Sequence, residues 1–315
     1  MATTTAEKKA PRLTPLWLVR WFDNHAKKSQ KPAKGIDWLQ AMPFIGMHVA
    51  CLAVFWVGWS WAAVGTAVAL YFLRMFFITG FYHRYFSHRT FRTSRWFQAA
   101  MAVAGCCAVQ RDPVWWASQH AHHHAYSDGP EDPHSPRQLG FWRAHVGWVI
   151  DRASHPTRDR YVQDWIRFPE LRFLNRFDLL PPILLAFAVF GWGILLETYA
   201  PSLGVDRWQM LVWGFFVSTV ALYHGTFTVN SLAHVFGNRR YATKDDSRNN
   251  WLIALITLGE GWHNNHHHYP SSTRQGFFWW EIDITYYGLL TLSRLGLIWD
   301  LRSVPERALG ANRAS

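Results

Sequence analysis

Long stretches without a charged side chain are the feature that most restricts how this chain can fold. Three stretches contain no Asp, Glu, Lys or Arg: Gln40–Leu73, Leu179–Leu196 and Trp208–Asn238. A helix needs about 20 consecutive apolar residues to cross a bilayer, whereas a surface helix of a soluble domain carries a polar face. The stretches therefore predict membrane-spanning helices rather than an ordinary soluble domain.

The first stretch is too long for one span, and Val57-Gly58-Trp59-Ser60-Trp61 offers a tight connection inside it. We expect helices at about 41–59 and 62–82, with Arg74 reaching toward the membrane interface. Two more spans are expected at about 179–197, where two prolines suit a first helical turn, and at about 208–230. The predicted fold is an all-α integral membrane protein with four transmembrane helices in two hairpins.

The basic residues predict how these spans lie in the membrane. The formal net charge is +11, and Arg207 is the only Lys or Arg in the two short hairpin links. Most of the other basic residues gather in a polar tail at 1–38 and in regions 83–178 and 231–300. Because cytoplasmic loops are enriched in Lys and Arg, we expect both termini in the cytoplasm, together with a helical cap made of 83–178 and 231–300.

A single domain is expected at 39–300, between the basic tail at 1–38 and a C-terminal tail at 301–315. The basic residues lie just outside the apolar spans, so the positive surface suits anionic lipid headgroups. The lipid bilayer is therefore an expected partner, and nucleic acid is not.

Smaller features fit the same plan. Two apolar segments, Phe97–Val109 and Trp251–Leu258, are too short to span and suit interfacial or buried positions. Cys51, Cys106 and Cys107 lie in apolar stretches without a metal-binding or disulfide spacing. We expect these cysteines to pack as small apolar residues.

Histidines gather in three boxes beside the apolar stretches, and a fourth element lies near the last span. The boxes are His83 and His88; His120, His123 and His124; and His263, His266 and His267, with Asn230 and His234 as the fourth element. Imidazole is the commonest protein ligand for transition metals. The predicted topology brings all four elements to the same membrane face, so we expect a metal centre in the cap.

Spacing separates the expected ligands from bystanders. Offsets of i, i+3 and i+4 place the rings of the second and third boxes on one helical face, whereas His122 and His268 fall off those faces. His83 and His88 are five residues apart, so either they serve two metals or the helix loosens between them. Four isolated histidines are expected to be packing or interfacial residues: His25, His48, His155 and His224.

The number of expected ligands points to two metal ions. The boxes and His234 together supply nine histidines, whereas a single zinc ion takes about four ligands. An imidazole-rich pair of sites that is open to a further ligand suits iron and oxygen chemistry. Asn230 lies one helical turn before His234, where its amide could hold a metal-bound water.

These motifs carry a resemblance to a known family. The pattern HxxxxH, HxxHH, NxxxH, HxxHH and the surrounding text GFYHRYFSHRTF, EDPHSP, AHVGW and GEGWHNNHHHYP resemble the membrane-bound fatty acid desaturases of the Δ9 or stearoyl-CoA type, in their bacterial form. The resemblance covers roughly Leu39–Tyr287. It implies a four-helix domain in a bacterial inner membrane, with two iron ions held by the nine histidines in a cytoplasmic cap.

The resemblance also implies a reaction. The family uses O2 and two electrons to remove two hydrogens from a saturated long-chain acyl group, leaving a cis double bond, here expected at Δ9. The substrate is expected to be an acyl-CoA or an acyl-lipid. A separate protein of the ferredoxin, cytochrome b5 or flavin reductase type is expected to supply electrons. The alternative is a membrane hydroxylase of acyl chains or alkanes, because the same metal set can insert oxygen.

Candidate substrate contacts flank the boxes. Tyr71, Met75 and Thr79 precede His83 at one-turn intervals, so their bulk is expected to set where the acyl chain ends. Three further candidates lie beside the second and third boxes: Trp116, Gln119 and Trp262.

The acyl carrier stays open at this point. Gln119 and Ala121 stand where animal members of the family have an acidic residue and an arginine. The basic residues Arg143, Arg152 and Arg158 are expected to dock an acidic electron donor or the headgroup of the acyl carrier.

Overall fold

A computed structural model describes residues 19, 21–24, 35–154, 156–311 and 313–314. Most of the tail predicted at 1–38 lies outside these residues, as do His25 and His155. The described part of the chain is mostly helical, with one two-stranded sheet.

Among the described residues, four helices are long and apolar enough to cross a membrane, as the charge-free stretches predict. They cover Trp38–Val57, Trp61–Ser87, Leu180–Tyr199 and Arg207–His234. The first consists of α2 (Trp38–Ala50), η2 (Cys51–Ala53) and α3 (Val54–Val57), the second of α4 (Trp61–Phe76) and η3 (Phe77–Ser87), and the third of α9 (Leu180–Tyr199). The fourth consists of α10 (Arg207–Leu211), η8 (Val212–Val217), α11 (Ser218–Asn230) and η9 (Leu232–His234).

Local sequence fixes where these helices begin. Asp37, Ser60 and Asp206 cap α2, α4 and α10 by accepting hydrogen bonds from backbone N–H groups of the first turn. Pro181 lies in the first turn of α9, where a missing N–H costs nothing. The predicted connection between the first two helices turns at Gly58, whose φ of +65° a side chain would disfavour.

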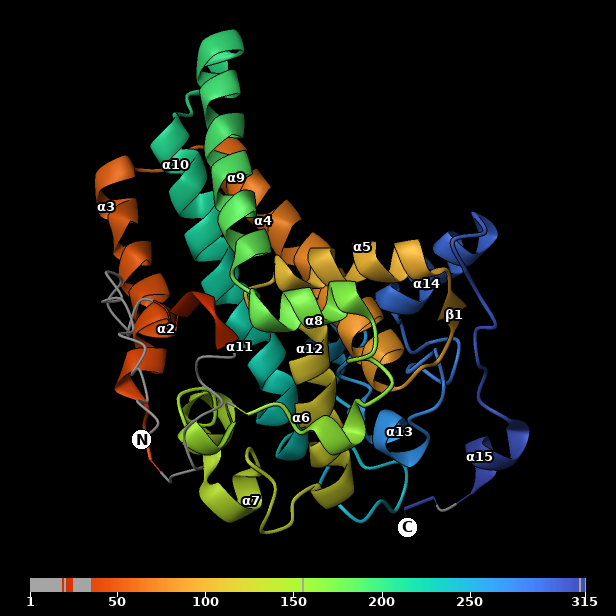
Figure 1. Cartoon of the computed structure of the whole chain (residues 1–315). Coiled ribbons are helices and arrows are strands. Elements are labelled where there is room, and N and C mark those ends of the chain that lie inside the picture. Colours follow the sequence, from red (N-terminus) through yellow and green to blue (C-terminus); the bar gives the residue numbers. More distant parts are fainter. Residues whose placement is uncertain (1–18, 20, 25–34, 155, 312, 315) are drawn as a thin grey trace, which may run out of the picture.

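Most of the remaining elements form a broader layer, here called the cap layer, at one end of the four helices (Figure 1). They are α5 (Arg95–Cys106), α6 (Pro113–Tyr126), α7 (Pro136–Leu139), η4 (Arg143–Gly147), η5 (Arg152–Ser154), η6 (Asp159–Tyr161), α8 (Pro169–Arg176), α12 (Trp251–Ile256), α13 (His263–His268), α14 (Ile284–Arg294) and α15 (Glu306–Gly310). The short helix η7 (Pro201–Leu203) belongs instead to the link between α9 and α10, at the opposite end of the helices. Strands β1 (Arg92–Thr93) and β2 (Ile298–Trp299) pair antiparallel. The two apolar segments predicted to be too short to span form α5 and α12.

The main hydrophobic core lies where the second long helix enters this layer. Every residue of η3 from Ile78 to Phe86 is buried. Its side chains pack with buried residues of α5 and α6, among them Met101 and Val114. The core therefore holds η3 and α6, which carry the first two histidine boxes, in a fixed relation.

The prediction for Arg74 is wrong. Its side chain does not reach the membrane interface but lies buried between helices, with 1% exposed. The guanidinium donates to Ser218 Oγ (2.5 Å), Thr219 Oγ1 (2.7 Å) and Cys107 O (3.3 Å). Hydroxyl groups on α11 accept hydrogen bonds from the guanidinium and so stabilise its charge inside the protein. The sequence of α4 alone contains no information about these partners.

Candidate metal centre

Nine histidines from four segments of the chain form two adjacent clusters. Cluster A contains His83, His88, His120, His124 and His266. Cluster B contains His123, His234, His263 and His267. Within each cluster, one ligand atom from every ring lies within 4.8 Å of the others. These are the nine histidines that the sequence patterns select.

Helices α6 and α13 each contribute to both clusters. The i, i+4 pair of α6 serves cluster A and its third histidine, His123, serves cluster B. In α13 the roles are reversed, since the i, i+4 pair serves cluster B and His266 serves cluster A. Rings at i, i+3 and i+4 share a helical face but diverge across it, so two helices packed together can supply both clusters.

The unusual spacing of the first box is explained by a π-helix. Segment η3 is π-helical over Phe77–Ser87, and the His88 N–H donates to His83 O (3.1 Å) in an i→i+5 bond. The centroids of the His83 and His88 rings lie 4.9 Å apart, and both rings belong to cluster A. Of the two alternatives left open by the sequence, the structure shows the loosened helix.

The ring nitrogens face one another at the separation that a shared metal requires. In cluster A, Nε2–Nε2 distances are 2.7 Å for His88–His120, 2.9 Å for His124–His266 and 3.1 Å for His83–His266. In cluster B, the distance for His234–His263 is 3.0 Å. Nitrogens bound at about 2.0–2.1 Å to one metal, at right angles, lie about 3 Å apart. The donor set therefore fits transition-metal ions.

Four buried carboxylates stand behind the imidazoles, and the histidine patterns do not reveal them. Each accepts a contact from the Nδ1 atom of a cluster histidine: Glu260 from His83 (2.5 Å), Asp132 from His123 (3.0 Å), Asp128 from His234 (2.8 Å) and Asp245 from His267 (2.7 Å). Such carboxylates orient metal-binding imidazoles and raise their basicity. The acidic residues in EDPHSP, KDDS and GEGWH, close to the boxes, are the sequence signal that could have identified most of them.

A further possible ligand group, His123 with Asp132 and His134, shares its first histidine with cluster B. Asp132 accepts from His123 Nδ1 and from the backbone N–H groups of Asp128 and His134. These bonds organise the loop after α6. They leave the other ring nitrogen of His123 for cluster B, so we interpret Asp132 as the carboxylate that orients His123.

Burial keeps most of the cluster imidazoles neutral. Loss of hydration, followed by the effect of neighbouring imidazoles, places the pKa well below its ordinary value for His88, His120, His124, His263 and His266. Burial lowers the pKa of His267 to about 4 against the opposing effect of Asp245. Burial also lowers the pKa of His123, but Asp132 more than compensates and the net shift is upward. Neutral imidazole is the form that binds metal.

The carboxylates behind the clusters are held ionised. Burial raises the pKa of Asp128, Asp132 and Asp245, but hydrogen bonds and charges from their histidine partners outweigh burial and bring each pKa well below the ordinary value. Burial likewise raises the pKa of Glu260, and the contacts with His83 and Arg84 outweigh it. The site thus brings four negative charges close to the two imidazole clusters.

The predicted bystanders have partners elsewhere. His122 bonds to Glu131 O (3.0 Å), and His268 bonds to Ala308 O (2.9 Å). His48 and His224 lie 3.2 Å apart through their Nε2 atoms, and His224 also bonds to His145 (3.0 Å). The contacts from His48 through His224 to His145 connect α2 and α11 to η4. These histidines therefore pack two of the long helices against the cap layer.

A small cavity of about 60 Å³, here called the metal-side cavity, lies beside the clusters. His83, His120, His123 and His263 line it, together with several of the residues singled out from the sequence: Met75, Thr79, Trp116, Gln119 and Asn230. The indole of Trp116 stacks on the His120 ring, 5.1 Å away. The described residues thus place the histidine clusters next to a small, partly open space with a largely apolar wall.

Other candidates lie outside the metal-side cavity. The hydroxyl of Tyr71 donates to Ile256 O (2.8 Å), and its ring packs where Gly225 leaves room. Trp262 borders a separate hollow near Arg240. Its indole N–H donates a hydrogen bond to Ile282 O (2.8 Å). Neither residue lines the metal-side cavity.

Two of the three arginines proposed for docking have partners within the protein. Arg143 forms an ion pair with Asp151, and Arg158 hydrogen bonds to Gln119 Oε1. Arg152 is exposed. The positive surface at this place is therefore smaller than the sequence suggests.

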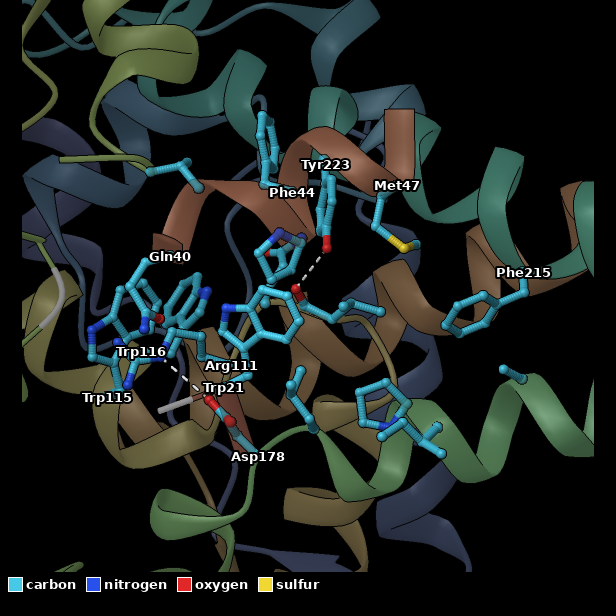
Figure 2. Close-up of a pocket in the computed structure, with 18 of the residues that line it drawn as sticks. Trp21, Gln40, Phe44, Met47, Arg111, Trp115, Trp116, Asp178, Phe215 and Tyr223 are labelled. Carbon is cyan, nitrogen blue, oxygen red and sulfur yellow. Dashed lines mark hydrogen bonds and ion pairs between the residues drawn. The ribbon is translucent and has the colours of Figure 1, made fainter. Parts of the chain in front are cut away.

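A larger cavity of about 640 Å³, here called the helix cavity, lies between α2, α9 and α11. Figure 2 shows Trp115 and Trp116 near one end of it and Phe215 at the other. Five residues line both this cavity and the metal-side cavity: Gln110, Trp115, Trp116, Trp148 and Phe227. The two cavities are thus neighbours that share a wall.

A family model for fatty acid desaturases matches residues 59–287. The chain belongs to the fatty acid desaturase family. The matched segment includes all nine cluster histidines and the four carboxylates behind them. Members of this family are oxidoreductases, and the four apolar helices and histidine clusters fit a metal-binding membrane enzyme of fatty acid metabolism.

Curated relatives agree with this membership. The chain is 38% identical over 282 residues to an sn-1 stearoyl-lipid 9-desaturase of Anabaena variabilis, a match that covers 89% of the chain and 98% of the relative. It is 34% identical to an sn-1 stearoyl-lipid 9-desaturase of Synechocystis, covering 100% of the chain and 88% of the relative. An acyl-CoA 5-desaturase of Anemone leveillei is 37% identical, covering 83% of the chain and 78% of the relative.

Proposed function

We propose that this fatty acid desaturase is a membrane di-iron enzyme that uses O2 to place a cis double bond, at Δ9, in a long-chain acyl group of a membrane lipid. The observation that carries the proposal is the convergence of nine imidazoles into two adjacent clusters beside a narrow cavity. Imidazole-rich sites suit iron and oxygen chemistry.

The residues fit two metal ions. Cluster A would hold one ion through five imidazoles, and cluster B the other through four. Asn230 lines the same cavity and would complete cluster B through a water. Among the described residues, Nε2 of His267 is buried without a hydrogen-bond partner. Such an atom is costly to bury unless a ligand satisfies it.

Bound iron would supply the oxidising power that an alkyl C–H bond requires, because such a bond has no acid–base handle. The chain's own residues hold the substrate. Gln110 donates to Thr226 Oγ1 (2.9 Å) where the two cavities meet, and Trp116 covers His120. Met75 and Thr79 lie in the same cavity wall, where their bulk limits how far the acyl chain extends. The apolar walls exclude water from the reacting carbons.

An acyl-lipid is the carrier we propose. The two cyanobacterial relatives that match nearly the whole chain are named as stearoyl-lipid 9-desaturases, whereas the plant relative is named as an acyl-CoA enzyme. These names do not favour a hydroxylase.

We also propose that the cap layer and both termini face the cytoplasm of a bacterial inner membrane. Support comes from the basic residues of the cap regions and from the positive-inside rule. The start of α2 joins that layer, since the Asp37 N–H donates to Ile150 O (3.2 Å). A separate electron donor of ferredoxin, cytochrome b5 or flavin reductase type would dock on the exposed basic face that includes Arg152.

Expression in a bacterial host that lacks unsaturated fatty acid synthesis tests the function. Double-bond mapping of the host lipids by mass spectrometry should show Δ9 cis unsaturation that disappears in the His120→Ala variant. A product that gains one oxygen instead of losing two hydrogens would indicate the hydroxylase alternative. Saturated lipids alone, from iron-loaded protein supplied with electrons, would contradict the proposal.

A further inference from the structure

We infer that the helix cavity binds the second acyl chain of a diacyl membrane lipid, which approaches the metal centre sideways from the bilayer while its first chain enters the metal-side cavity. The inference rests on the proposed function, because it names the substrate class and its route. Its basis is the position, depth, continuity and polar end of the helix cavity.

The helix cavity opens on the surface that would face lipid. Its walls come from α2, α9 and the fourth long helix, all of which are apolar enough to span a membrane. Four of its lining residues are also exposed: Pro43, Ile183 (36%), Phe187 (70%) and Trp208 (58%). Side chains that line a cavity and are also exposed mark its mouth, so a lipid chain could enter between α2 and α9.

The depth of the cavity suits one leaflet of a bilayer. Its lining along α9 runs from Leu179 to Phe190, which is about 16 Å at 1.5 Å per residue. The hydrocarbon core of a bilayer is about 30 Å thick, so one leaflet contributes about half of that. The lining also begins at the end of α9 nearest the cap layer. An acyl chain anchored at that surface would therefore extend along the cavity.

The helix cavity continues toward the metals. Trp115, Trp116 and Trp148 line both cavities, and Trp116 stacks on the cluster histidine His120. The metal-side cavity, at about 60 Å³, is much smaller than the helix cavity, at about 640 Å³. A diacyl lipid that directs one chain toward the metals offers its second chain for the larger space.

Polar groups stand where the two chains of such a lipid would meet. At the cap end, Gln40 lines the helix cavity beside Arg111 and Asp178, whose side chains form an ion pair of 3.3 Å (Figure 2). The side-chain amide N–H of Gln40 and the guanidinium of Arg111 offer hydrogen-bond donors to ester carbonyls. The rest of the wall is mostly aromatic and aliphatic, as a pocket for an acyl chain requires.

The variant Ala186→Trp tests the inference, since Ala186 lines the helix cavity and an indole would fill it. Leu184→Trp is the matched control, because Leu184 lies on the same helix, is 58% exposed and does not line the cavity. Both variants would be expressed in the host without unsaturated lipids. Ala186→Trp should lower lipid desaturation about tenfold or more while keeping its iron, and Leu184→Trp should match the wild type.

A second measurement, made on the wild-type protein as well, keeps the test decisive if Ala186→Trp folds poorly. Wild-type protein would be placed in vesicles of phosphatidylglycerol with a photoreactive group on the sn-2 chain. Labelling of the peptide that carries Phe44 and Met47 is expected, and Ala186→Trp should remove it while Leu184→Trp keeps it. Equal desaturation by both variants, or no label on this peptide in the wild type, would overturn the inference. An inactive wild type would instead contradict the proposed function.

Discussion

The carboxylates behind the imidazoles are distributed unevenly between the clusters. Asp128, Asp132 and Asp245 contact three of the four histidines of cluster B, whereas cluster A has Glu260 alone behind His83. A carboxylate on Nδ1 makes the imidazole a stronger donor and fixes its orientation. We therefore expect cluster B to hold its metal more tightly than cluster A does.

Replacing one of these carboxylates should weaken metal binding selectively. In Asp245→Asn, His267 loses its charged partner, and metal retention in cluster B should fall about 10- to 100-fold. Chelator titration of the iron-loaded protein, followed by iron analysis, measures the effect.

The neighbouring variant Asp246→Asn is the control, because the Asp246 side chain pairs with Arg137 at the surface and contacts no cluster histidine. Equal iron loss from Asp245→Asn and Asp246→Asn would show that the carboxylate behind His267 does not matter.

Metal should be lost from these clusters at a lower pH than from exposed histidines. Protons compete with metal only when the pH approaches the imidazole pKa, and this lies at about 4 for His267 and well below the ordinary value for most of the others. Because a lowered pKa moves protonation to lower pH, iron in cluster A, where four of the five histidines have such a pKa, should stay bound down to about pH 5. Iron retained after dialysis at stepped pH measures this, and half-loss near pH 6.5 would contradict it.

At the scale of elements, the π-helical η3 is stabilised by a buried ionic group. The guanidinium of Arg84, wholly buried, contacts Glu260 (3.0 Å) and Asp283 (2.9 Å) and donates to Thr273 O (2.8 Å). Glu260 in turn contacts His83. Arg84 thereby ties the first histidine box to the segments before and after α13.

Removing this arginine should destabilise the protein strongly. Arg84→Met leaves two buried carboxylates without their partner, which costs about 3–5 kcal/mol. Arg92→Met is the control, because Arg92 forms a solvent-exposed pair with Asp300 (3.5 Å) and such pairs contribute little. Thermal unfolding in detergent compares the two variants, and a similar small shift in both would contradict a structural role for Arg84.

The end of the metal-side cavity should control chain length. Met75 is 1% exposed and lines this cavity, so Met75→Ala would enlarge it and allow longer acyl chains. Tyr71→Ala is a weaker test than the sequence suggests, because Tyr71 bonds to Ile256 O and does not line the cavity. Product chain lengths by gas chromatography measure both, and an unchanged distribution in Met75→Ala would remove Met75 from this role.

The elements also show what the sequence could and could not predict. The four apolar helices and the nine histidines follow from local patterns, because charge-free length and ring spacing are properties of single segments. The division of α6 and α13 between two clusters depends on how these helices pack, and no single segment contains that information. The carboxylates were missed because Asp128, Asp245 and Glu260 act across loops that the chain brings together only on folding.

At the scale of the whole molecule, the long helices and the layer at their end meet at the metal centre. The second long helix ends within one residue of His88, and the fourth ends at His234. The cavities extend from this junction along the helices. The fold thus joins an apolar region, suited to acyl chains, to histidine clusters that the long helices and the end layer build together.

The central claim is that two iron ions occupy the two clusters, and metal content tests it most directly. Iron per chain would be measured for protein purified without oxygen and reconstituted with ferrous iron. We expect about two ions in the wild type and in His268→Ala, whose ring bonds to Ala308 O instead. His266→Ala in cluster A and His263→Ala in cluster B should each lose iron. One ion in the wild type, or two in both cluster variants, would contradict the account.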